Sequence, residues 1–144
     1  MILNSYEIKK LIPHRKPFLF IDSCEVIEIA TKGIGYKTFL KEESFFEGHF
    51  PNNPIVPGVV LIEALAQTAG VVVSMKFEDN TNKSVLFMSI SKAKFRKPVL
   101  PDHHIIFKVE CINNVMSVYK FQGVAYHENQ KVCEAEFSAM IYEN

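Results

Sequence analysis

One stretch of the chain, residues 59–77, is rich in alanine, leucine and valine and contains no proline. This composition predicts an α-helix whose apolar residues fall on almost every side. Such a helix is stable only when other structure encloses it, so the rest of the chain must surround it. Glu63, Gln67 and Thr68 interrupt the apolar run, whereas a membrane span needs roughly 20 mostly apolar residues. We expect a buried central helix and no membrane insertion.

The hydrophobic pattern after residue 80 alternates with a period of two, which is typical of strands. A segment before the long helix, 26–40, predicts a strand pair broken near Gly33 and Gly35, because glycine often marks a turn. A short helix should open the chain, with Asn4 or Ser5 as its N-cap. The alternation predicts strands at 85–95, 105–110, 115–126 and 131–142.

About six strands and one long enclosed helix favour an α+β fold in which an antiparallel sheet wraps around the helix. This arrangement is the hot-dog fold. No repeat, low-complexity tract or linker divides the chain, so residues 1–144 are expected to form a single domain. A half-wrapped sheet leaves an open edge, and we therefore expect a homodimer joined sheet to sheet.

The amino-acid composition favours a globular protein over a disordered or nucleic-acid-binding one. Hydrophobic residues make up 48% of the chain and charged residues 22%, as in globular proteins. The formal net charge of zero gives no general attraction to nucleic acid or to an anionic membrane. The three cysteines form no CxxC pair, which favours free thiols in a reducing compartment. Residues 1–11 lack the apolar core of a signal peptide, so we expect a cytoplasmic protein.

Glu63 is the unusual residue of the predicted helix. It shares one stripe with Gln67, Gly70 and Ser74, at intervals of four, three and four residues. A carboxylate in such apolar surroundings is costly unless it is paired, hydrogen-bonded or protonated. A protonated carboxyl group suits a proton donor, and Gln67 could orient it from one turn away. A glutamate at the rim of the core that pairs with a lysine is an equal alternative.

The start of the predicted helix lacks a capping side chain. Pro57 and Gly58 precede it, and no Ser, Thr, Asp or Asn occupies the expected cap position. The first backbone N–H groups of a helix need acceptors and favour negative charge. The amides near Gly58 and Val59 could therefore polarise a ligand carbonyl, as an oxyanion hole does. Ordered water at this end of the helix is the alternative.

His49 lies between Gly48 and Phe50 in the proline-rich loop that leads into the helix. The prolines stiffen this loop, and a rigid mount suits a general base. A turn-stabilising or solvated role is the alternative for any one of the five histidines. His103 and His104 should point to opposite faces, and His14 and His127 have no companion ligands at metal spacing. We therefore predict no metal site.

A group of basic residues forms a fourth candidate feature. Lys92, Lys94 and Arg96 alternate along a predicted strand and should share one face, which Lys97, Arg15 and Lys16 would extend. A docking site for an acidic protein and an ordinary solvated strand face explain this pattern equally well.

Four runs of the sequence are distinctive: GHFPNNPIVPGV at 48–59, EALAQ at 63–67, PHRKPFL at 13–19 with Asp22, and KFRKPV at 94–99. Together they resemble one known family, the FabZ-type 3-hydroxyacyl-[acyl-carrier-protein] dehydratases. The resemblance covers nearly the whole chain in the right order, and its central run is long and specific.

The resemblance implies a reaction and its residues. It implies dehydration of a (3R)-3-hydroxyacyl thioester on acyl carrier protein to the trans-2-enoyl thioester, in fatty acid and lipid A biosynthesis. His49 and Glu63 correspond to the catalytic pair of the family. The related FabA-type enzymes carry Asp at the glutamate position, so Glu63 points to the FabZ type. The division of acid and base duties between the two residues stays open.

The resemblance also implies an assembly and a substrate carrier. Active sites of the family lie at a dimer interface, with His from one subunit and Glu from the other, and many members are trimers of dimers. No cofactor is expected, because phosphopantetheine arrives on the carrier protein. The sequence leaves open whether the assembly is a dimer or a hexamer, and which acyl chain length is preferred.

The sequence departs from the family at one turn. Members usually have Pro-Gly-Asp where this chain has Pro101-Asp102-His103, so the turn geometry there is expected to differ. Two rival functions are a hot-dog thioesterase, which uses an Asp or Glu to activate water, and a non-catalytic acyl-binding module. Thioesterases of this fold lack the Gly-His-Phe-Pro run at 48–51, and a binding module has no need for both His49 and Glu63.

Overall fold

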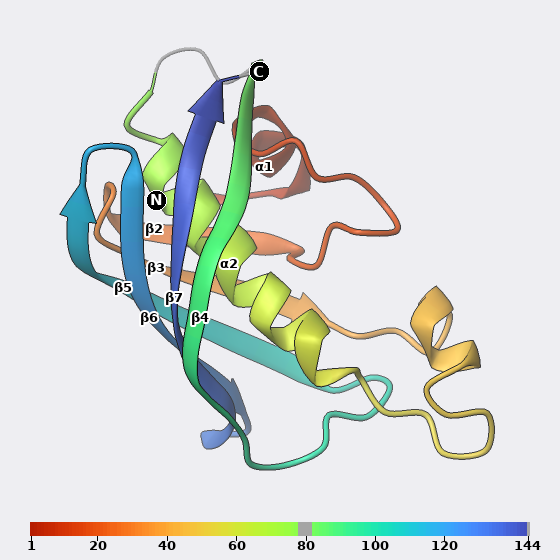
Figure 1. Cartoon of the computed structure of the whole chain (residues 1–144). Coiled ribbons are helices and arrows are strands. Elements are labelled where there is room, and N and C mark those ends of the chain that lie inside the picture. Colours follow the sequence, from red (N-terminus) through yellow and green to blue (C-terminus); the bar gives the residue numbers. More distant parts are fainter. Residues whose placement is uncertain (78–81, 144) are drawn as a thin grey trace.

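The computed structural model describes residues 1–77 and 82–143, and these form one curved sheet around a long helix (Figure 1). Seven strands pair in the order β1-β2-β3-β5-β6-β7-β4, and every neighbouring pair is antiparallel. The elements are β1 (Ile2–Leu3), α1 (Ser5–Leu11), β2 (Ser23–Glu28), β3 (Lys32–Thr38), the 3-10 helix η1 (Ser44–Glu47), α2 (Gly58–Ser74), β4 (Lys83–Phe95), β5 (His104–Val115), β6 (Val118–His127) and β7 (Gln130–Glu143).

The predicted α+β hot-dog fold is confirmed, although the sheet has seven strands rather than about six. The additional strand, β1, is only two residues long, which is too short to produce a visible alternation. The strand β5 also runs further than the expected range of 105–110, because it continues through a bulge between Cys111 and Asn113. The opening helix begins as predicted, with Asn4 as N-cap in a capping box with Glu7.

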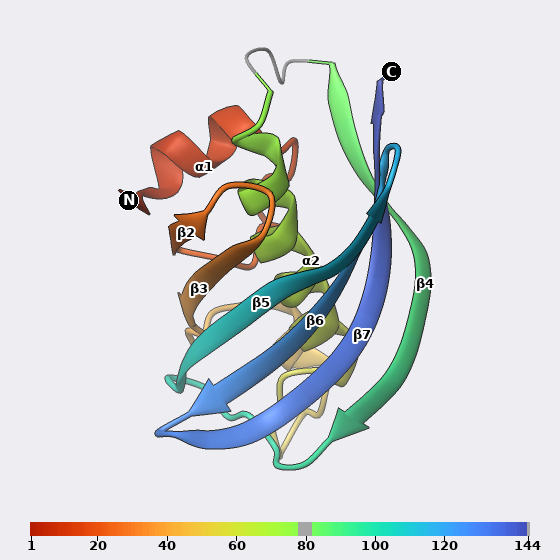
Figure 2. The same ribbon diagram turned by 90° about the vertical axis from the view of Figure 1, so that its left-hand side faces the viewer.

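The helix α2 occupies the hollow of the sheet, which curves around it (Figure 2). Every residue from Leu65 to Ser74 is buried, and Leu65 and Val71 are fully enclosed. On the sheet side, large side chains such as Phe107, Phe121 and Phe137 complete the same core. The all-round apolar composition of α2 is therefore explained by enclosure on all sides. Among the described helices, none is long and apolar enough to cross a membrane.

Gly33 and Gly35 lie inside strand β3, so the prediction that the strand pair breaks at them was wrong. The chain turns earlier, between β2 and β3, where Ala30 adopts a φ of 60°. The glycines instead allow α2 to approach the sheet. A Cβ atom on Gly33 would lie 2.3 Å from Cγ2 of Val72, and one on Gly35 would lie 2.2 Å from Oγ1 of Thr68. Glycine inside a strand here marks a close approach of the helix.

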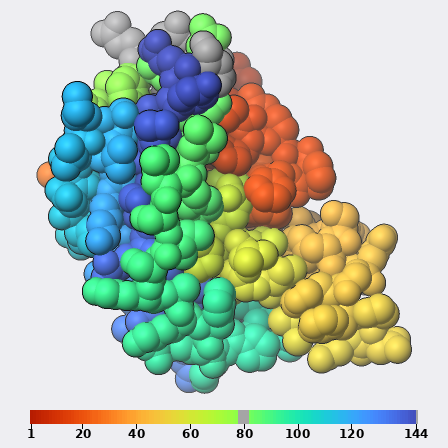
Figure 3. Space-filling model, in the orientation of Figure 1, coloured from red at the N-terminus to blue at the C-terminus, as the bar shows by residue number. Residues whose placement is uncertain are grey.

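The strand β4 forms an open edge of the sheet and is 13 residues long. Figure 3 shows it in green, running along the surface of the molecule. Long edges with apolar side chains are templates for pairing with another chain. The exposed large apolar residues of β4 are Leu86, Phe87, Met88, Ile90 and Phe95.

Candidate active site

Glu63 lies on the second turn of α2 with 17% of its side chain exposed. Its Oε2 atom accepts a hydrogen bond of 3.0 Å from Nε2 of Gln67, one turn further along the helix. The predicted contact between these two residues is thus present. The alternative reading of a core-rim glutamate paired with a lysine finds no support among the described residues, because the ion-pair contact of Glu63 is with a histidine.

The side chain of Gln67 is completely buried and its orientation is fixed by the backbone. Its Oε1 accepts from the N–H of Phe20 at 2.7 Å, and its Nε2 donates to the carbonyl of Phe18 at 2.9 Å. Because the oxygen faces an N–H donor, the amide nitrogen must face the carbonyl and Glu63. Gln67 therefore presents a donor to Glu63, and the loop that contains Phe18 and Phe20 holds that donor in place.

His14 is the second neighbour of Glu63, and the sequence reasoning missed it. Its Nε2 lies 3.4 Å from Oε2 of Glu63, and the imidazole is 14% exposed. His14 stands in the segment between α1 and β2, so the segment brings an imidazole to α2 across a long sequence separation. The two side chains line a small cavity with Ala66, Val85 and Phe87 and with Ala139 of β7.

His49 lies in the loop between η1 and α2, which Figure 1 shows beside the start of α2. Its Nδ1 is 2.9 Å from the carbonyl oxygen of Ile55. A carbonyl can only accept, so Nδ1 carries the hydrogen. In the neutral ring Nε2 then has a free lone pair, which is the form that a general base requires. The ring also stacks on Phe50, with 4.1 Å between centroids.

The imidazole of His49 opens into a cleft of about 450 Å³ at the N-terminus of α2. Gly58 and Val59, the first residues of the helix, line the same cleft, and its N-cap Pro57 makes no side-chain hydrogen bond. The sequence placed His49 and the uncapped helix start together, and the structure brings them into one cleft. Phe95 and Val99 form part of its apolar wall.

Within one chain, Glu63 and His49 open into different cavities. The cleft of His49 and the small cavity of Glu63 share no lining residue. Both cavities nevertheless touch the edge strand β4. Phe95, at the end of β4, lines the first, and Val85 and Phe87, near its start, line the second.

The basic residues do not form the single alternating face that the sequence predicts. The register of β4 shifts between Ser91 and Lys94, and the strand ends before Arg96. Lys92 pairs with Glu136 at 3.2 Å, and Arg96 pairs with Glu134 at 3.1 Å. The hydrogen bond from Arg96 to Glu134 raises the pKa of the guanidinium and lowers the pKa of the carboxyl group. The surface is therefore of mixed charge.

The remaining basic residues have separate surroundings. The guanidinium of Arg15 donates to the carbonyls of Lys9 and Ile12 and thus caps the end of α1. Lys16 lines a groove that also contains acidic residues, among them Asp22 and Glu42. Of the six basic residues predicted to form the docking face, only Arg96 and Lys97 line the cleft of His49.

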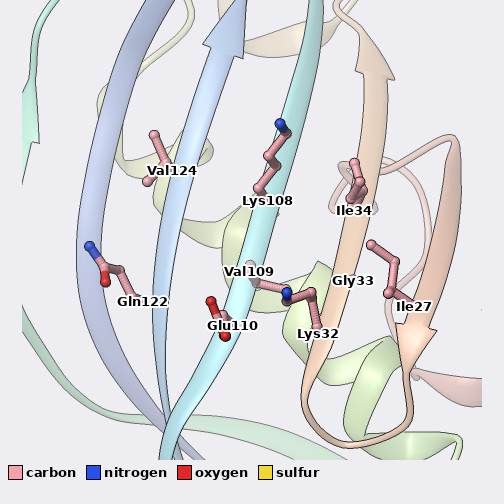
Figure 4. Close-up of a pocket in the computed structure, with 9 residues that line it drawn as sticks. All are labelled: Ile27, Lys32, Gly33, Ile34, Lys108, Val109, Glu110, Gln122 and Val124. Atoms are coloured by element: carbon pink, nitrogen blue, oxygen red, sulfur yellow. The ribbon is translucent and has the colours of Figure 1, made fainter.

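A further groove, of about 440 Å³, lies on the outer face of the sheet (Figure 4). It is lined by residues of strands β2, β3, β5 and β6, including Lys32, Lys108 and Glu110. None of its lining residues belongs to the predicted site. The alternation of apolar and charged side chains along these strands is that of an ordinary solvated sheet face.

The turn that departs from the family pattern contains a residue in the left-handed region. Asp102, where the family usually has glycine, adopts a φ of 69°, a conformation in which aspartate is tolerated better than most residues. His103 supports this turn, because its Nδ1 accepts from the N–H of Leu100 at 3.1 Å. Among the described residues, no group of three His, Cys, Asp or Glu side chains is placed to hold a metal ion.

Comparison with known proteins shows the family to which the chain belongs. Residues 12–136 match the family model described as a FabA-like domain. The chain is 42% identical to the 3-hydroxyacyl-[acyl-carrier-protein] dehydratase FabZ of Sulfurovum sp. (strain NBC37-1), and the match covers 98% of both chains. It is 45% identical to the protein of that name from Caulobacter vibrioides (strain NA1000 / CB15N), over 95% of this chain and 87% of the relative.

Solved structures with low sequence identity share the fold. The dehydratase heterocomplex ApeI:P from Xenorhabdus doucetiae has a TM-score of 0.77 at 14% identity, covering 95% of this chain and 91% of that one. A hypothetical thioesterase with coenzyme A from Streptococcus pneumoniae TIGR4 has a TM-score of 0.61 at 14% identity, covering 84% and 87%. The family model matches most of the chain, and the relatives are 42% and 45% identical over nearly its whole length. The chain therefore belongs to the FabA-like family and, within it, to the FabZ type.

Proposed function

We propose that this protein dehydrates 3-hydroxyacyl thioesters carried on acyl carrier protein to trans-2-enoyl thioesters in fatty acid biosynthesis. The full-length similarity to proteins named for this reaction supports the proposal. So does the one geometric observation on which it depends most. The hydrogen bond from Nδ1 of His49 to Ile55 leaves Nε2 of His49 unprotonated in the neutral ring and open to the cleft.

The reaction needs a base, an acid and a site for negative charge. His49 removes a proton from C2 of the substrate, and the electron pair forms the C2=C3 double bond as the C3–O bond breaks. Glu63 gives a proton to the departing hydroxyl group, which leaves as water. The amides at the start of α2, near Gly58 and Val59, stabilise the charge that develops on the thioester carbonyl. Gln67 orients the carboxyl group of Glu63 through its 3.0 Å hydrogen bond.

The active site is completed by a second copy of the chain, joined through β4. The separate cavities of His49 and Glu63 within one chain support this arrangement. If β4 pairs with itself antiparallel, a twofold axis near Ile90 brings Val85 of one copy beside Phe95 of the other. Because Val85 lines the cavity of Glu63 and Phe95 lines the cleft of His49, this register joins the two half-sites.

The proposal is tested by replacing each member of the pair. His49→Ala and Glu63→Gln should each keep the folded assembly and lose at least about a hundredfold in kcat, the usual scale for a positioned acid or base. Formation of the enoyl thioester is followed by its ultraviolet absorbance, and circular dichroism checks the fold. Near wild-type turnover by either variant would show that the residue does not have its proposed role.

Mixing the two variants tests the shared site. After subunit exchange in equal amounts, half of the dimers are mixed, and each mixed dimer has one site with both functional groups. Activity should therefore return to about a quarter of the wild-type value. If both groups came from the same chain, mixing would restore nothing.

A thioesterase reaction is distinguished by its product. Hydrolysis releases a free thiol, whereas dehydration keeps the thioester and forms an enoyl group. The likeness to a hypothetical thioesterase concerns the fold alone, so the dehydratase reaction is favoured. A non-catalytic acyl-binding module would bind the loaded carrier protein without turnover.

The proposal also covers the domain, the cofactor requirement, the assembly, the location and the docking residues. We propose that residues 1–144 form a single dehydratase domain, that no cofactor is needed beyond the phosphopantetheine of the substrate, and that the dimers assemble as trimers. A cytoplasmic location and a role in lipid A biosynthesis also stay predictions. We propose Arg96 and Lys97 as the main docking residues for the carrier protein, since they line the His49 cleft. Lys92, Lys94, Arg15 and Lys16 are weaker candidates.

A further inference from the structure

We propose that His14 is a positioning residue for Glu63: its Nε2–H holds one carboxyl oxygen, and its Nδ1 binds a water molecule. This inference rests on the proposed dehydratase function. Three features of the structure carry it, namely the contact between the two side chains, the unpartnered second nitrogen of the ring, and the cavity that encloses both groups.

The first feature is the convergence of two side chains on one oxygen. Nε2 of His14 lies 3.4 Å from Oε2 of Glu63, and Nε2 of Gln67 donates to the same atom at 3.0 Å. Since the backbone fixes Gln67 as a donor, a hydrogen on Nε2 of His14 would give Oε2 two donors. The proton that leaves with the substrate hydroxyl is then carried by Oε1. The two neighbours thus decide which oxygen of Glu63 is the acid.

The second feature is the other nitrogen of the ring. Nδ1 of His14 is a buried polar atom without a hydrogen-bond partner among residues 1–77 and 82–143, which the structure describes. Such groups are rare in native proteins, and a bound water commonly satisfies them. With the hydrogen on Nε2, the Nδ1 atom is an acceptor and can receive an O–H from such a water.

The third feature is the space available. The cavity lined by His14 and Glu63 has a volume of about 10 Å³. A single water molecule needs about 10–15 Å³, so the space beside His14 in one chain is of the size that holds one water. His14 can therefore orient the carboxyl group of Glu63 without touching the acyl chain itself.

Few charges surround the pair. The cavity walls from α2, β4 and β7 are apolar and consist of Ala66, Val85, Phe87 and Ala139. Apart from Glu63, the charged group placed against His14 is the guanidinium of Arg15, which donates to the carbonyl of His14 at 2.7 Å. That bond fixes the backbone from which the imidazole projects. Among the described residues that line the cavity, Glu63 is therefore the charged neighbour of the imidazole.

Three substitutions separate the two functions of the ring. In His14→Gln the side-chain amide can reach Glu63 and replaces the Nε2 donor. In His14→Asn the amide lies nearer to the position of Nδ1, so the contact with Glu63 is lost. His14→Leu removes both. His104→Gln is the matched control, because His104 is exposed on β5 and its Nδ1 contacts Oγ1 of Thr38 at 2.9 Å.

Kinetics with a hydroxyacyl carrier-protein substrate give the test. We expect kcat to fall about ten- to a hundredfold in His14→Leu and His14→Asn, as for misplacement of a catalytic group, while KM changes by less than about threefold. His14→Gln should recover most of that loss, and His104→Gln should match the wild type. A merely structural histidine would instead lower stability and leave kcat per folded molecule unchanged.

The outcomes that overturn the inference are distinct from those that overturn the function. Equal kcat values for His14→Gln and His14→Asn, or a wild-type kcat in His14→Leu, contradict the positioning role while Glu63→Gln stays inactive. If the wild-type protein itself forms no enoyl product, the proposed function fails instead. Should His14→Leu not fold, the comparison of the Gln and Asn variants still decides.

Discussion

The two halves of the proposed site are built in opposite ways. Glu63 projects from the second turn of a buried helix into a cavity of about 10 Å³ and contacts the side chains of Gln67 and His14. His49 projects from a loop into a cleft of about 450 Å³, and a single hydrogen bond to Ile55 sets its ring. One half has almost no free space, and the other is open to a ligand.

This difference matches the duties that we propose. A group that only has to deliver a proton needs an exact orientation and little room, which a rigid scaffold supplies. A group that meets the incoming thioester needs space for the substrate and a polarising environment next to it, which the start of α2 supplies. Substitutions in each half should therefore have different effects on turnover.

The largest effect should come from separating the two halves. In Ile90→Lys, two lysines would face each other near the twofold axis of a β4 pair, where like charges repel. We expect a folded monomer with at least about a hundredfold less activity, because neither half-site contains both groups. Sedimentation and dehydration assays measure this. Ile112→Lys is the control, since Ile112 on β5 is as exposed, at 49% against 50%. A fully active Ile90→Lys monomer would show that the site lies within one chain.

The next effect should come from loosening the Glu63 half. Gln67→Leu leaves the N–H of Phe20 buried without an acceptor, which should lower the free energy of unfolding by about 2 kcal/mol. It should also lower kcat about tenfold, because Glu63 loses a donor. Urea unfolding and steady-state kinetics measure the two changes. Gln122→Leu, at an exposed position of β6, should change neither. A fall in stability with unchanged kcat would limit Gln67 to a structural role.

A smaller effect is expected from crowding the His49 half. A Cβ atom on Gly58 would lie 2.5 Å from the ring of Phe95, so Gly58→Ala must displace that ring into the cleft. Because Phe95 is 55% exposed and can move, we expect only about a fivefold loss of kcat/KM. Gly48→Ala is the control, since no atom of the described residues lies within 4 Å of a Cβ atom built at Gly48. An unchanged kcat/KM in Gly58→Ala would mean that the substrate does not contact this wall.

The smallest effect should come from the carrier-protein surface. Arg96 is paired with Glu134 and partly exposed, so Arg96→Gln should lower kcat/KM only about two- to threefold. The loss should appear with a carrier-protein substrate at low salt and vanish with a small acyl thioester. Lys108→Gln, on the outer sheet face of Figure 4, should have no effect with either substrate. A loss with both substrates would place Arg96 in the acyl site instead.

Much of the fold was predictable from periodicity and composition. The central helix was expected at 59–77 and is observed at Gly58–Ser74, and strand β7 was expected at 131–142 and is observed at Gln130–Glu143. The misread glycines show the limit of local reasoning. A glycine in a strand and a glycine in a turn look alike in a sequence, and only the position of α2 explains Gly33 and Gly35.

The local grouping of the candidate residues was predictable where they are close in sequence. Glu63 and Gln67 are one turn apart, and His49 precedes the start of α2, so spacing indicated each group and left a rim glutamate and a turn-stabilising histidine as alternatives. His14 is different, because it meets Glu63 only through the tertiary fold. The run PHRKPFL at 13–19, which contains His14, contributes to the family resemblance. However, helix or strand periodicity cannot predict a contact between residues 14 and 63, which are far apart in the sequence.

The absence of a side chain at Gly35 has a consequence for how this protein can vary. Oγ1 of Thr68 occupies the space above Gly35 and donates to the carbonyl of Ala64, the residue that follows Glu63. A single added methyl group at position 35 would therefore push the helix outward and shift Glu63, although position 35 lies in the sheet beneath α2. Tolerance to mutation in this fold is thus set partly by clearance beneath the helix, far from any atom that reacts.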